Sequence, residues 1–335
     1  MHKPLNLFPD PYIVLVVSMV GLASLLPARG QAAEVFALVT DAAIVLLFFL
    51  HGARLSRDAV LAGLGHWRLH LLVLASTFVL FPILGLAAYA VGGLFLDPSL
   101  AAGLLFMALL PSTVQSSIAF TAVGKGNVAA AVCSASASNL IGIFVTPLLV
   151  NLMLAPYVGA GGGGVSLGQV EAIALQLLLP LVLGHLSRPW TAAWLAKRTK
   201  GVGLVDRGSI LLVVYTAFSA AVVEGLWTKL SAVDLGGVLL VDAAVLALVL
   251  AATTAAARLL RFPREDEAAI VFCGSKKSLA SGVPMAGVLF PAAVVGPMIV
   301  PLMLFHQIQL MVCAVLARRY AARAAAEAQD ARDSP

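Results

Sequence analysis

Charged residues are scarce in this chain, since Asp, Glu, Lys and Arg make up only 11% of its 335 residues. Soluble globular proteins carry roughly 25% charged residues. The chain is also 61% hydrophobic and has a mean hydropathy of +1.01. This composition excludes a disordered chain, argues strongly against a soluble enzyme and predicts a membrane protein.

Cysteine and enzyme motifs are also lacking. The three cysteines, Cys133, Cys273 and Cys313, are scattered through apolar stretches and form neither a disulfide framework nor a CxxC metal site. The motifs HExxH, GxSxG and GxxxxGK[ST] are absent. Adjacent residues diverge on a helix, so Ser275 and Lys276 are weak support for a Ser/Lys hydrolase. We therefore expect no enzyme activity, no resident cofactor and no nucleic-acid partner.

Ten apolar segments cover most of the chain, and each is long enough for a helix through hydrocarbon roughly 30 Å thick. Helices are expected because open strands in lipid leave backbone groups unpaired, and barrel strands would be shorter and alternating. The predicted fold class is an all-α polytopic membrane protein with ten transmembrane helices. The segments run at about 12–27, 33–50, 69–93, 100–122, 127–154, 166–186, 207–226, 235–257, 266–290 and 294–317.

The distribution of Lys and Arg predicts the orientation of these segments. With ten spans, 17 of the 21 Lys and Arg residues fall on the side that holds both termini. The opposite side holds only Arg29 and Lys229, and Lys276 and Lys277 lie inside a segment. Because cationic loops stay in the cytoplasm, both termini are expected there, in a bacterial inner membrane.

A glycine-rich stretch at 155–165 lies at the midpoint of the chain and predicts a flexible linker. It leaves five spans on each side. Because five is odd, a duplicated five-span unit is inserted upside down in its second copy. That inverted repeat is typical of secondary transporters.

The fourth span of each half contains a predicted interruption. Proline removes a backbone donor, and the carbonyls that it frees can face a ligand. Because matched interruptions in two inverted halves point to a binding site, we expect them to meet near mid-membrane. One interruption is Pro111–Ser117 and the other is Cys273–Ser278, followed by Ser281, Gly282 and Pro284. The candidate site residues in them are Thr113, Gln115, Ser116, Ser117, Ser275, Lys276, Lys277 and Ser278.

Lys276 and Lys277 are the most unusual residues of the chain. A lysine near mid-membrane costs about 2.5–3.5 kcal/mol even on lenient insertion scales. Snorkelling to the interface is the alternative, but a position at a helix break disfavours it. We therefore expect at least one of the two to line a polar cavity.

Further polar residues lie in other segments, and each has a structural alternative. Ser134, Ser138 and Asn139 are candidate ligands in segment five, or serve close helix packing and a bridge to segment four. Segment ten contains His306, Gln307 and Gln309, which bind either a ligand or a neighbouring helix. We take His306 and Gln309 as candidate site residues. Asp41 and Asp242 are candidates for burial, with proton coupling and a structural bond both open.

Three stretches resemble the bile acid:sodium symporter superfamily, and in particular its orphan branch of bacterial symporters and the seventh human bile-acid carrier. They are 49–56 (FLHGARLS), 110–117 (LPSTVQSS) leading to 124–128 (GKGNV), and 273–280 (CGSKKSLA). The resemblance implies a panel of helices packed against a core in which helices four and nine cross, with substrate between panel and core. The panel would comprise 12–50 and 166–226, the core 69–154 and 235–317, and a cytoplasmic tail 318–335.

The chain departs from the sodium-coupled members of that superfamily at their sodium sites. The resemblance implies an Asn, hydroxyls, a Glu and a Gln at positions held here by Ile118, Ala131, Ala135, Val271 and Ser275. The oxygens of Ser117, Ser138 and Asn139 could substitute as a sodium site. The resemblance therefore supports the superfamily's fold for this chain but gives little support for sodium coupling.

We expect a secondary active transporter that moves a small organic anion by alternating access. The alternative is a membrane regulatory or assembly protein that keeps the fold without turnover. The expected partners of the transporter are the anion and the lipid bilayer, and its expected coupling ion is sodium or a proton. We further expect an ammonium from Lys276 or Lys277 to replace sodium. Adjacent ammonium groups disfavour each other's charge, so a lysine that loses its proton would couple transport to protons.

The charge distribution gives a direct prediction of topology. A single cysteine placed beside Lys200 should be cytoplasmic, with the whole stretch at about 187–206. We expect it to resist an impermeant thiol reagent in intact cells and to react in inverted membrane vesicles. Labelling from the outside of intact cells would contradict the predicted orientation.

Overall fold

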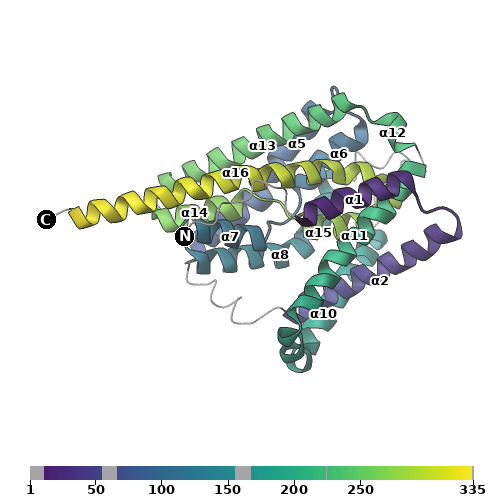
Figure 1. The fold of residues 1–335 in the computed structure, drawn as a ribbon, viewed down its shortest axis with the longest axis horizontal. Helices are drawn as coiled ribbons and strands as arrows, with labels where there is room; N and C mark the ends of the chain where they lie inside the picture. The colour runs from purple at the N-terminus through teal and green to yellow at the C-terminus, as the bar shows by residue number, and fades with distance from the viewer. Residues whose placement is uncertain (1–10, 55–65, 155–166, 224, 334–335) are drawn as a thin grey trace. The chain divides into compact units, whose positions relative to one another are not determined.

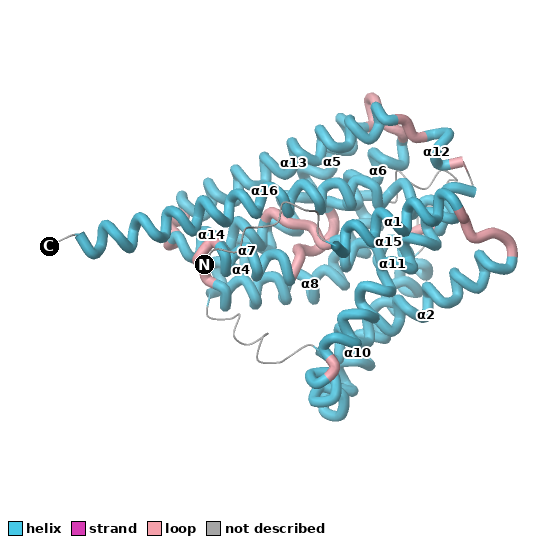
Figure 2. Tube along the Cα trace, in the orientation of Figure 1, coloured by secondary structure: helices cyan, strands magenta, loops and turns pink. Residues whose placement is uncertain are grey.

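The computed structural model describes residues 11–54, 66–154, 167–223 and 225–333. Every regular element among these residues is a helix, which confirms the predicted all-α class (Figures 1 and 2). The glycine-rich stretch at 155–165 lies outside the described residues.

Each of the ten predicted apolar segments coincides with one helix or with consecutive helices. In chain order these are α1 (Pro11–Leu25), α2 (Gln31–Arg54), α4 (Trp67–Ala75), the π-helical turn η2 (Ser76–Leu80), α5 (Phe81–Gly92), α6 (Pro98–Ala108), α7 (Gln115–Val123), α8 (Val128–Leu149), the π-helical turn η3 (Val150–Leu154), α10 (Leu167–Lys197), α11 (Thr199–Val223), α12 (Leu226–Lys229), α13 (Ala232–Leu259), α14 (Arg264–Gly274), α15 (Leu279–Leu289) and α16 (Ala292–Asp333).

Six of these helical stretches in the described residues are long and apolar enough to cross a membrane. Two shorter apolar helices, Val14–Leu25 and Pro98–Ala108, accompany them. The six are Gln31–Arg54, Trp67–Gly92, Val128–Leu154, Thr199–Val223, Ala232–Leu259 and Ala292–Glu327.

Both predicted interruptions are present. The first separates α6 from α7, and the second separates α14 from α15. Pro111 lies in the first gap, where it has no amide hydrogen to continue a helix and disfavours helical geometry at Leu110. Figure 2 shows the interruptions as loop segments between helices.

The cytoplasmic loop predicted at about 187–206 is wrong as a loop. Helix α10 continues through Lys197, and α11 begins at Thr199, so only Arg198 separates them. The predicted tail at 318–335 is likewise helical as far as Asp333, as the end of α16 (Figure 1). Both stretches are polar enough to leave lipid, but their many Ala, Leu, Lys and Arg residues favour helix.

The chain divides into two compact units. The first comprises Met1–Arg54, Leu179–Lys229 and Val283–Pro297, and the second comprises Leu55–Leu178, Leu230–Gly282 and Met298–Pro335. In the first unit α11 packs against both α1 and α2. The hydroxyls of Thr40 and Thr216 lie 2.9 Å apart and join α2 to α11.

Two glycines allow α2 and α10 to touch through their backbones. A Cβ atom added at Gly52 would lie 1.9 Å from the carbonyl oxygen of Leu181. One added at Gly184 would lie 2.0 Å from the carbonyl oxygen of Phe49. Small residues at facing positions are how membrane helices achieve such close contact.

In the second unit α14 occupies a central place, because it packs against α4, α7, α8 and α13. Its inner face lies in an apolar cluster with Val73 of α4, Ala131 and Ala135 of α8, and its own Ile270 and Cys273. The half-helix that ends at the second interruption is therefore fixed on several sides.

The contact between α2 and α10 predicts a position-specific effect of added methyl groups. Gly184→Ala should destabilise the protein by about 1–3 kcal/mol, the usual cost of overpacking, because its methyl group overlaps a carbonyl oxygen. Gly208→Ala on α11 is the control, since no atom lies within 4 Å of its added Cβ. It should stabilise by about 0.5–1 kcal/mol through better helix propensity. Thermal unfolding in detergent measures both, and equal stability of the two variants would contradict the contact.

Candidate functional site

The two interruptions meet in the second unit and satisfy each other's backbone. The Ser112 hydroxyl donates a hydrogen bond to the carbonyl oxygen of Cys273 (2.5 Å), and the Ser117 hydroxyl donates to that of Phe272 (2.8 Å). Both acceptors belong to the last turn of α14, where helix carbonyls lack partners within the helix. Serines of the first interruption therefore cap the half-helix of the second.

Two further hydrogen bonds tie the second interruption to its neighbours. The backbone amide of Ser278 donates to the carbonyl oxygen of Pro111 (2.9 Å), which joins the two interruptions directly. The Ser76 hydroxyl of η2 donates to the carbonyl oxygen of Gly274 (2.8 Å). The predicted meeting of the two stretches is thus confirmed at the level of hydrogen bonds.

Helix α8 connects to both interruptions through Asn139 and Ser138. The Asn139 amide nitrogen donates to the carbonyl oxygen of Ser112 (2.6 Å), and its carbonyl oxygen accepts from the Ser281 hydroxyl (2.7 Å). The Ser138 hydroxyl accepts from the Ser112 backbone amide (3.1 Å). The structural bridge, one of the two predicted roles of Asn139, is the one that these contacts form.

Helix α16 holds the second interruption through Gln309. The side chain accepts from the Lys277 backbone amide and donates to the Lys277 carbonyl oxygen, both at 2.9 Å. Its amide nitrogen also lies 2.8 Å from Nδ1 of His306. The helix-to-helix hydrogen bond that was one alternative is therefore observed for Gln309, whereas the contact of His306 with Gln309 lies within α16.

Lys277 carries a fully buried amino group that is held by backbone carbonyls. Its Nζ donates to the carbonyl oxygens of Leu110 (2.6 Å) and Thr77 (2.8 Å), and the side chain is 0% exposed. The same Nζ lies 4.1 Å from the ring centroid of Phe81, within cation–π range. One side chain thus links the first interruption, the second interruption and the helix that contains η2.

The π-helical turn explains why a carbonyl is available at Thr77. In η2 the Phe81 amide donates to Ser76, five residues earlier. In the same register the donor to Thr77 would be Pro82, which has no amide hydrogen. The carbonyl oxygen of Thr77 therefore has a free acceptor direction, and Lys277 fills it.

Lys276 has different surroundings from its neighbour. It is also 0% exposed, but its Nζ has no hydrogen-bond partner among the described residues. The Nζ lies 4.1 Å from the ring centroid of Phe120 and 5.6 Å from that of Phe272. Carbonyls and aromatic rings surround the two lysines in this conformation, and the lining of a polar cavity by at least one of them stays a prediction.

Other predicted residues lie within the first interruption. The Thr113 hydroxyl lies 2.7 Å from that of Ser116 and 3.0 Å from that of Ser117, so these three form a local hydroxyl cluster. Gln115 is exposed at the start of α7, and its side chain is not among the buried polar groups that connect the interruptions.

Two predicted serines make contacts away from the meeting point. The Ser275 hydroxyl donates to the carbonyl oxygen of Val271 (2.6 Å), one turn earlier on the chain. Ser134 lies 2.6 Å from Nδ1 of His70, which joins α8 to α4. Both contacts are structural in this conformation.

The oxygens predicted as possible sodium ligands all have protein partners. Ser117 donates to the backbone, Ser138 accepts from the backbone, and the Asn139 carbonyl accepts from Ser281. A metal-binding group of three or more His, Cys, Asp or Glu residues does not occur in the part of the chain that is described.

The two aspartates considered as buried candidates differ. Asp41 is exposed, so its predicted burial is wrong. Asp242 is 0% exposed, and neither carboxylate oxygen has a hydrogen-bond partner among the described residues. A structural bond to a neighbouring helix and proton binding by Asp242 both stay predictions.

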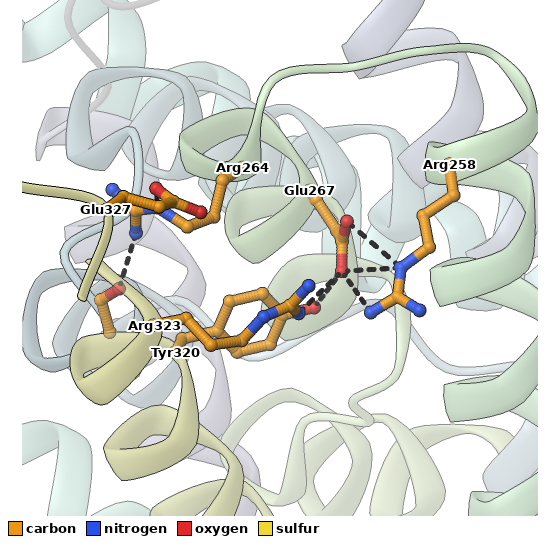
Figure 3. Close-up of polar contacts among 7 residues, drawn as sticks. Arg258, Arg264, Glu267, Tyr320, Arg323 and Glu327 are labelled. Atoms are coloured by element: carbon orange, nitrogen blue, oxygen red, sulfur yellow. Dashed lines mark hydrogen bonds and ion pairs between the residues drawn. The ribbon is translucent and has the colours of Figure 1, made fainter. Parts of the chain in front are cut away.

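An ionic cluster fixes the far end of α14 to α16. Glu267 accepts from the Arg258 guanidinium (3.1 Å) and from the Tyr320 hydroxyl (2.7 Å), while Arg323 lies 3.8 Å away. Figure 3 shows Glu267 between Arg258 on one side and the α16 residues on the other. Both arginine side chains are about half exposed, so each ion pair contributes little, of the order of 0–1 kcal/mol.

Arg264 likewise connects α7, α14 and α16 through its guanidinium group. Its guanidinium donates to Glu327 (2.8 Å, Figure 3). It also donates to the carbonyl oxygen of Lys125 (3.2 Å), just beyond the C-terminus of α7. A cation is favourable at the negative end of a helix. Both half-helices that point away from the interruptions are therefore anchored at their outer ends.

An all-helical, strongly apolar chain whose two interrupted helices meet around buried polar groups has the construction of a membrane transport protein. The chain belongs to the SBF-like CPA transporter family, whose model matches residues 10–322. This membership confirms the resemblance to the bile acid:sodium symporter superfamily.

Individual relatives agree with this placement. The chain is 57% identical to "Putative symporter YfeH" of Escherichia coli, over 93% of this chain and 92% of the relative. It is 55% identical to "Uncharacterized protein PA2026" of Pseudomonas aeruginosa, over 96% of each chain. Identity to "Sodium/bile acid cotransporter 7" of the mouse is 26%, over 91% and 90% of the two chains.

Proposed function

We propose that the protein is a secondary active transporter that moves a small organic anion across a bacterial inner membrane by alternating access. Membership of a transporter family supports membrane transport, and it does not favour the alternative of a regulatory or assembly protein without turnover. The observation that carries the proposal is the buried amino group of Lys277 on carbonyls at the meeting point of two interrupted helices.

The proposed architecture has ten transmembrane helices in two inverted repeats of five, with both termini cytoplasmic. Ten helical stretches at the predicted positions support it, as do interruptions in the fourth stretch of each half. The proposed panel comprises 12–50 and 166–226, and the proposed core comprises 69–154 and 235–317. The two compact units support this division for the proposed panel, although Val283–Pro297 of the proposed core belongs to the first unit. Alternating access requires groups of helices that move as bodies.

The coupling ion of this proposal is the proton and not sodium. Sodium binds where several oxygens converge, and in this site the carbonyl oxygens of Leu110 and Thr77 converge on an ammonium instead. Lys277 is therefore proposed as a built-in cation that does for the interrupted helices what a bound sodium would do. With this built-in cation, the site would need no sodium ion from solution.

Lys276 is proposed as the group that gains and loses the proton. A buried amine without an acceptor is favoured in its neutral form, because burial in low dielectric penalises charge. The titratable groups that face it are the thiols of Cys273 and Cys313, and neither supplies a negative charge as a thiol. Binding of an organic anion would supply that charge, so anion and proton would bind together and cross together.

The polar residues around the interruptions are proposed to position the anion when the site opens. Hydroxyls and amides that now bind one another can exchange those partners for carboxylate or sulfate oxygens. The proposed set comprises Thr113, Gln115, Ser116, Ser117, Ser134, Ser138, Asn139, Ser275, Ser278, His306 and Gln309.

Transport in proteoliposomes tests this assignment. Counterflow of radiolabelled anions, screened over carboxylates and sulfonates, first identifies a substrate. Uptake of that substrate should be unchanged when potassium replaces sodium, and should rise when the outside is made more acidic. Lys276→Met should lower proton-driven uptake by about tenfold or more, since a charge-assisted hydrogen bond is worth about 1.5–3 kcal/mol.

Two controls make the result specific. Lys197→Met removes an exposed lysine and should leave uptake unchanged. Asp242→Asn tests the other buried titratable group, and loss of pH dependence in that variant alone would move the proton site from Lys276 to Asp242. A saturable sodium requirement that survives substitution of either lysine would contradict the proposal. Absence of counterflow with every anion would favour the regulatory protein.

A further inference from the structure

A pocket of about 340 Å³ in the first compact unit has no part in the proposed transport site. It is formed where the end of α2, the last turns of α10 and the start of α11 come together. Its lining residues are Ala53, Arg54, Arg188, Ala192, Leu195, Ala196, Thr199 and Val202.

One side of this pocket is suited to an anion. Arg54 and Arg188 come from different helices, and no acidic side chain is among the described residues that line the pocket. Helix α11 begins at Thr199, so its first amides lie at the same wall, beside the C-terminus of α10 at Lys197. Two guanidinium groups and a helix N-terminus are strong donors for phosphate oxygens.

The floor of the pocket is apolar. Leu195 and Val202 are buried and belong to a cluster that also includes Leu50 and Ala53. Arg54 is placed at the edge of this floor, where its Nε donates to the carbonyl oxygen of Leu50 (3.3 Å). A cationic wall over an apolar floor fits an amphiphilic anion better than a fully hydrophilic one.

The surface of α10 beside the pocket has the character of a membrane interface. Leu186 (62% exposed), Trp190 (80%) and Trp194 (53%) recur every four residues and so lie on one helix face. The Arg198 guanidinium lies 4.5 Å from the Trp194 ring. Tryptophan is enriched at the level of lipid headgroups, and basic residues on the cytoplasmic side attract anionic lipids.

We propose that this pocket binds the phosphate group of an anionic phospholipid, clamped between Arg54 and Arg188, with the acyl chains over the apolar face of α10. This inference rests on the membrane location and not on the transport proposal. It assigns a role to Arg54, which lies in the 49–56 motif and has none in transport. Because the lipid would bridge three helices, it would stabilise the first unit.

Thermal unfolding of lipid-free protein in neutral detergent tests the site. Added phosphatidylglycerol should raise the unfolding temperature, whereas phosphatidylcholine with the same acyl chains should not. Arg54→Gln and Arg188→Gln should each abolish most of the shift. The control Arg319→Gln removes an exposed arginine of α16 and should keep it. Native mass spectrometry should show the matching loss of retained phosphatidylglycerol.

Three outcomes would overturn the proposal. Equal shifts with the two lipids would show that the site does not distinguish an anionic headgroup from a zwitterionic one. A full shift with inorganic phosphate or glycerol phosphate alone would identify a water-soluble phosphate as the ligand in place of a lipid. Ala192→Leu fills the pocket without changing charge and tests the case in which the arginine variants fold poorly. Persistence of the shift in that variant would assign it to general surface charge.

Discussion

The pair of hydrogen bonds from the buried Lys277 side chain is the interaction on which the meeting of the two interrupted helices depends. Interrupting a helix leaves backbone carbonyls without donors, and a buried acceptor without a donor costs about 1–3 kcal/mol. A lysine at one interruption supplies donors to the other interruption and to the π-helical turn of a third helix. The cost of burying a charge and the cost of breaking helices thus offset each other.

Neutral polar groups satisfy most of what remains. Ser112 and Ser117 cap the end of α14, Asn139 bridges both interruptions, and Gln309 pairs with both backbone groups of Lys277. Such connected networks are sensitive to the loss of any member, because a partly satisfied buried network is costly. The same property lets a transport site exist in two states, since an anion can replace internal partners with oxygens of its own.

Several of these features could be predicted from the sequence because they depend on local chemistry. Pro111, the small residues around Gly274 and the apolar segments on either side indicate interrupted membrane helices without knowledge of their neighbours. The different roles of Lys276 and Lys277 could not be predicted, because both lie in the non-helical stretch between α14 and α15 and their partners come from other helices. The role of Thr77 could not be predicted either, because its partner comes from another helix, although Pro82 five residues after it in an apolar run was a usable signal. The helical structure at 187–206 was not predicted from the sequence. The polar residues there indicate where the chain leaves the lipid, but they do not indicate where a helix ends.

Thermal unfolding of Lys277→Met and Lys276→Met, compared in the same detergent, tests the central claim most directly. Methionine has nearly the shape of lysine without its charge. The account predicts that Lys277→Met loses at least about 2 kcal/mol relative to Lys276→Met, because two buried carbonyls lose their donor. Lys276→Met should be neutral or stabilising, because a thioether packs well against Phe120 and Phe272 and no hydrogen bond is lost. If Lys277→Met proved as stable as Lys276→Met or more so, the ammonium would not hold the interrupted helices together.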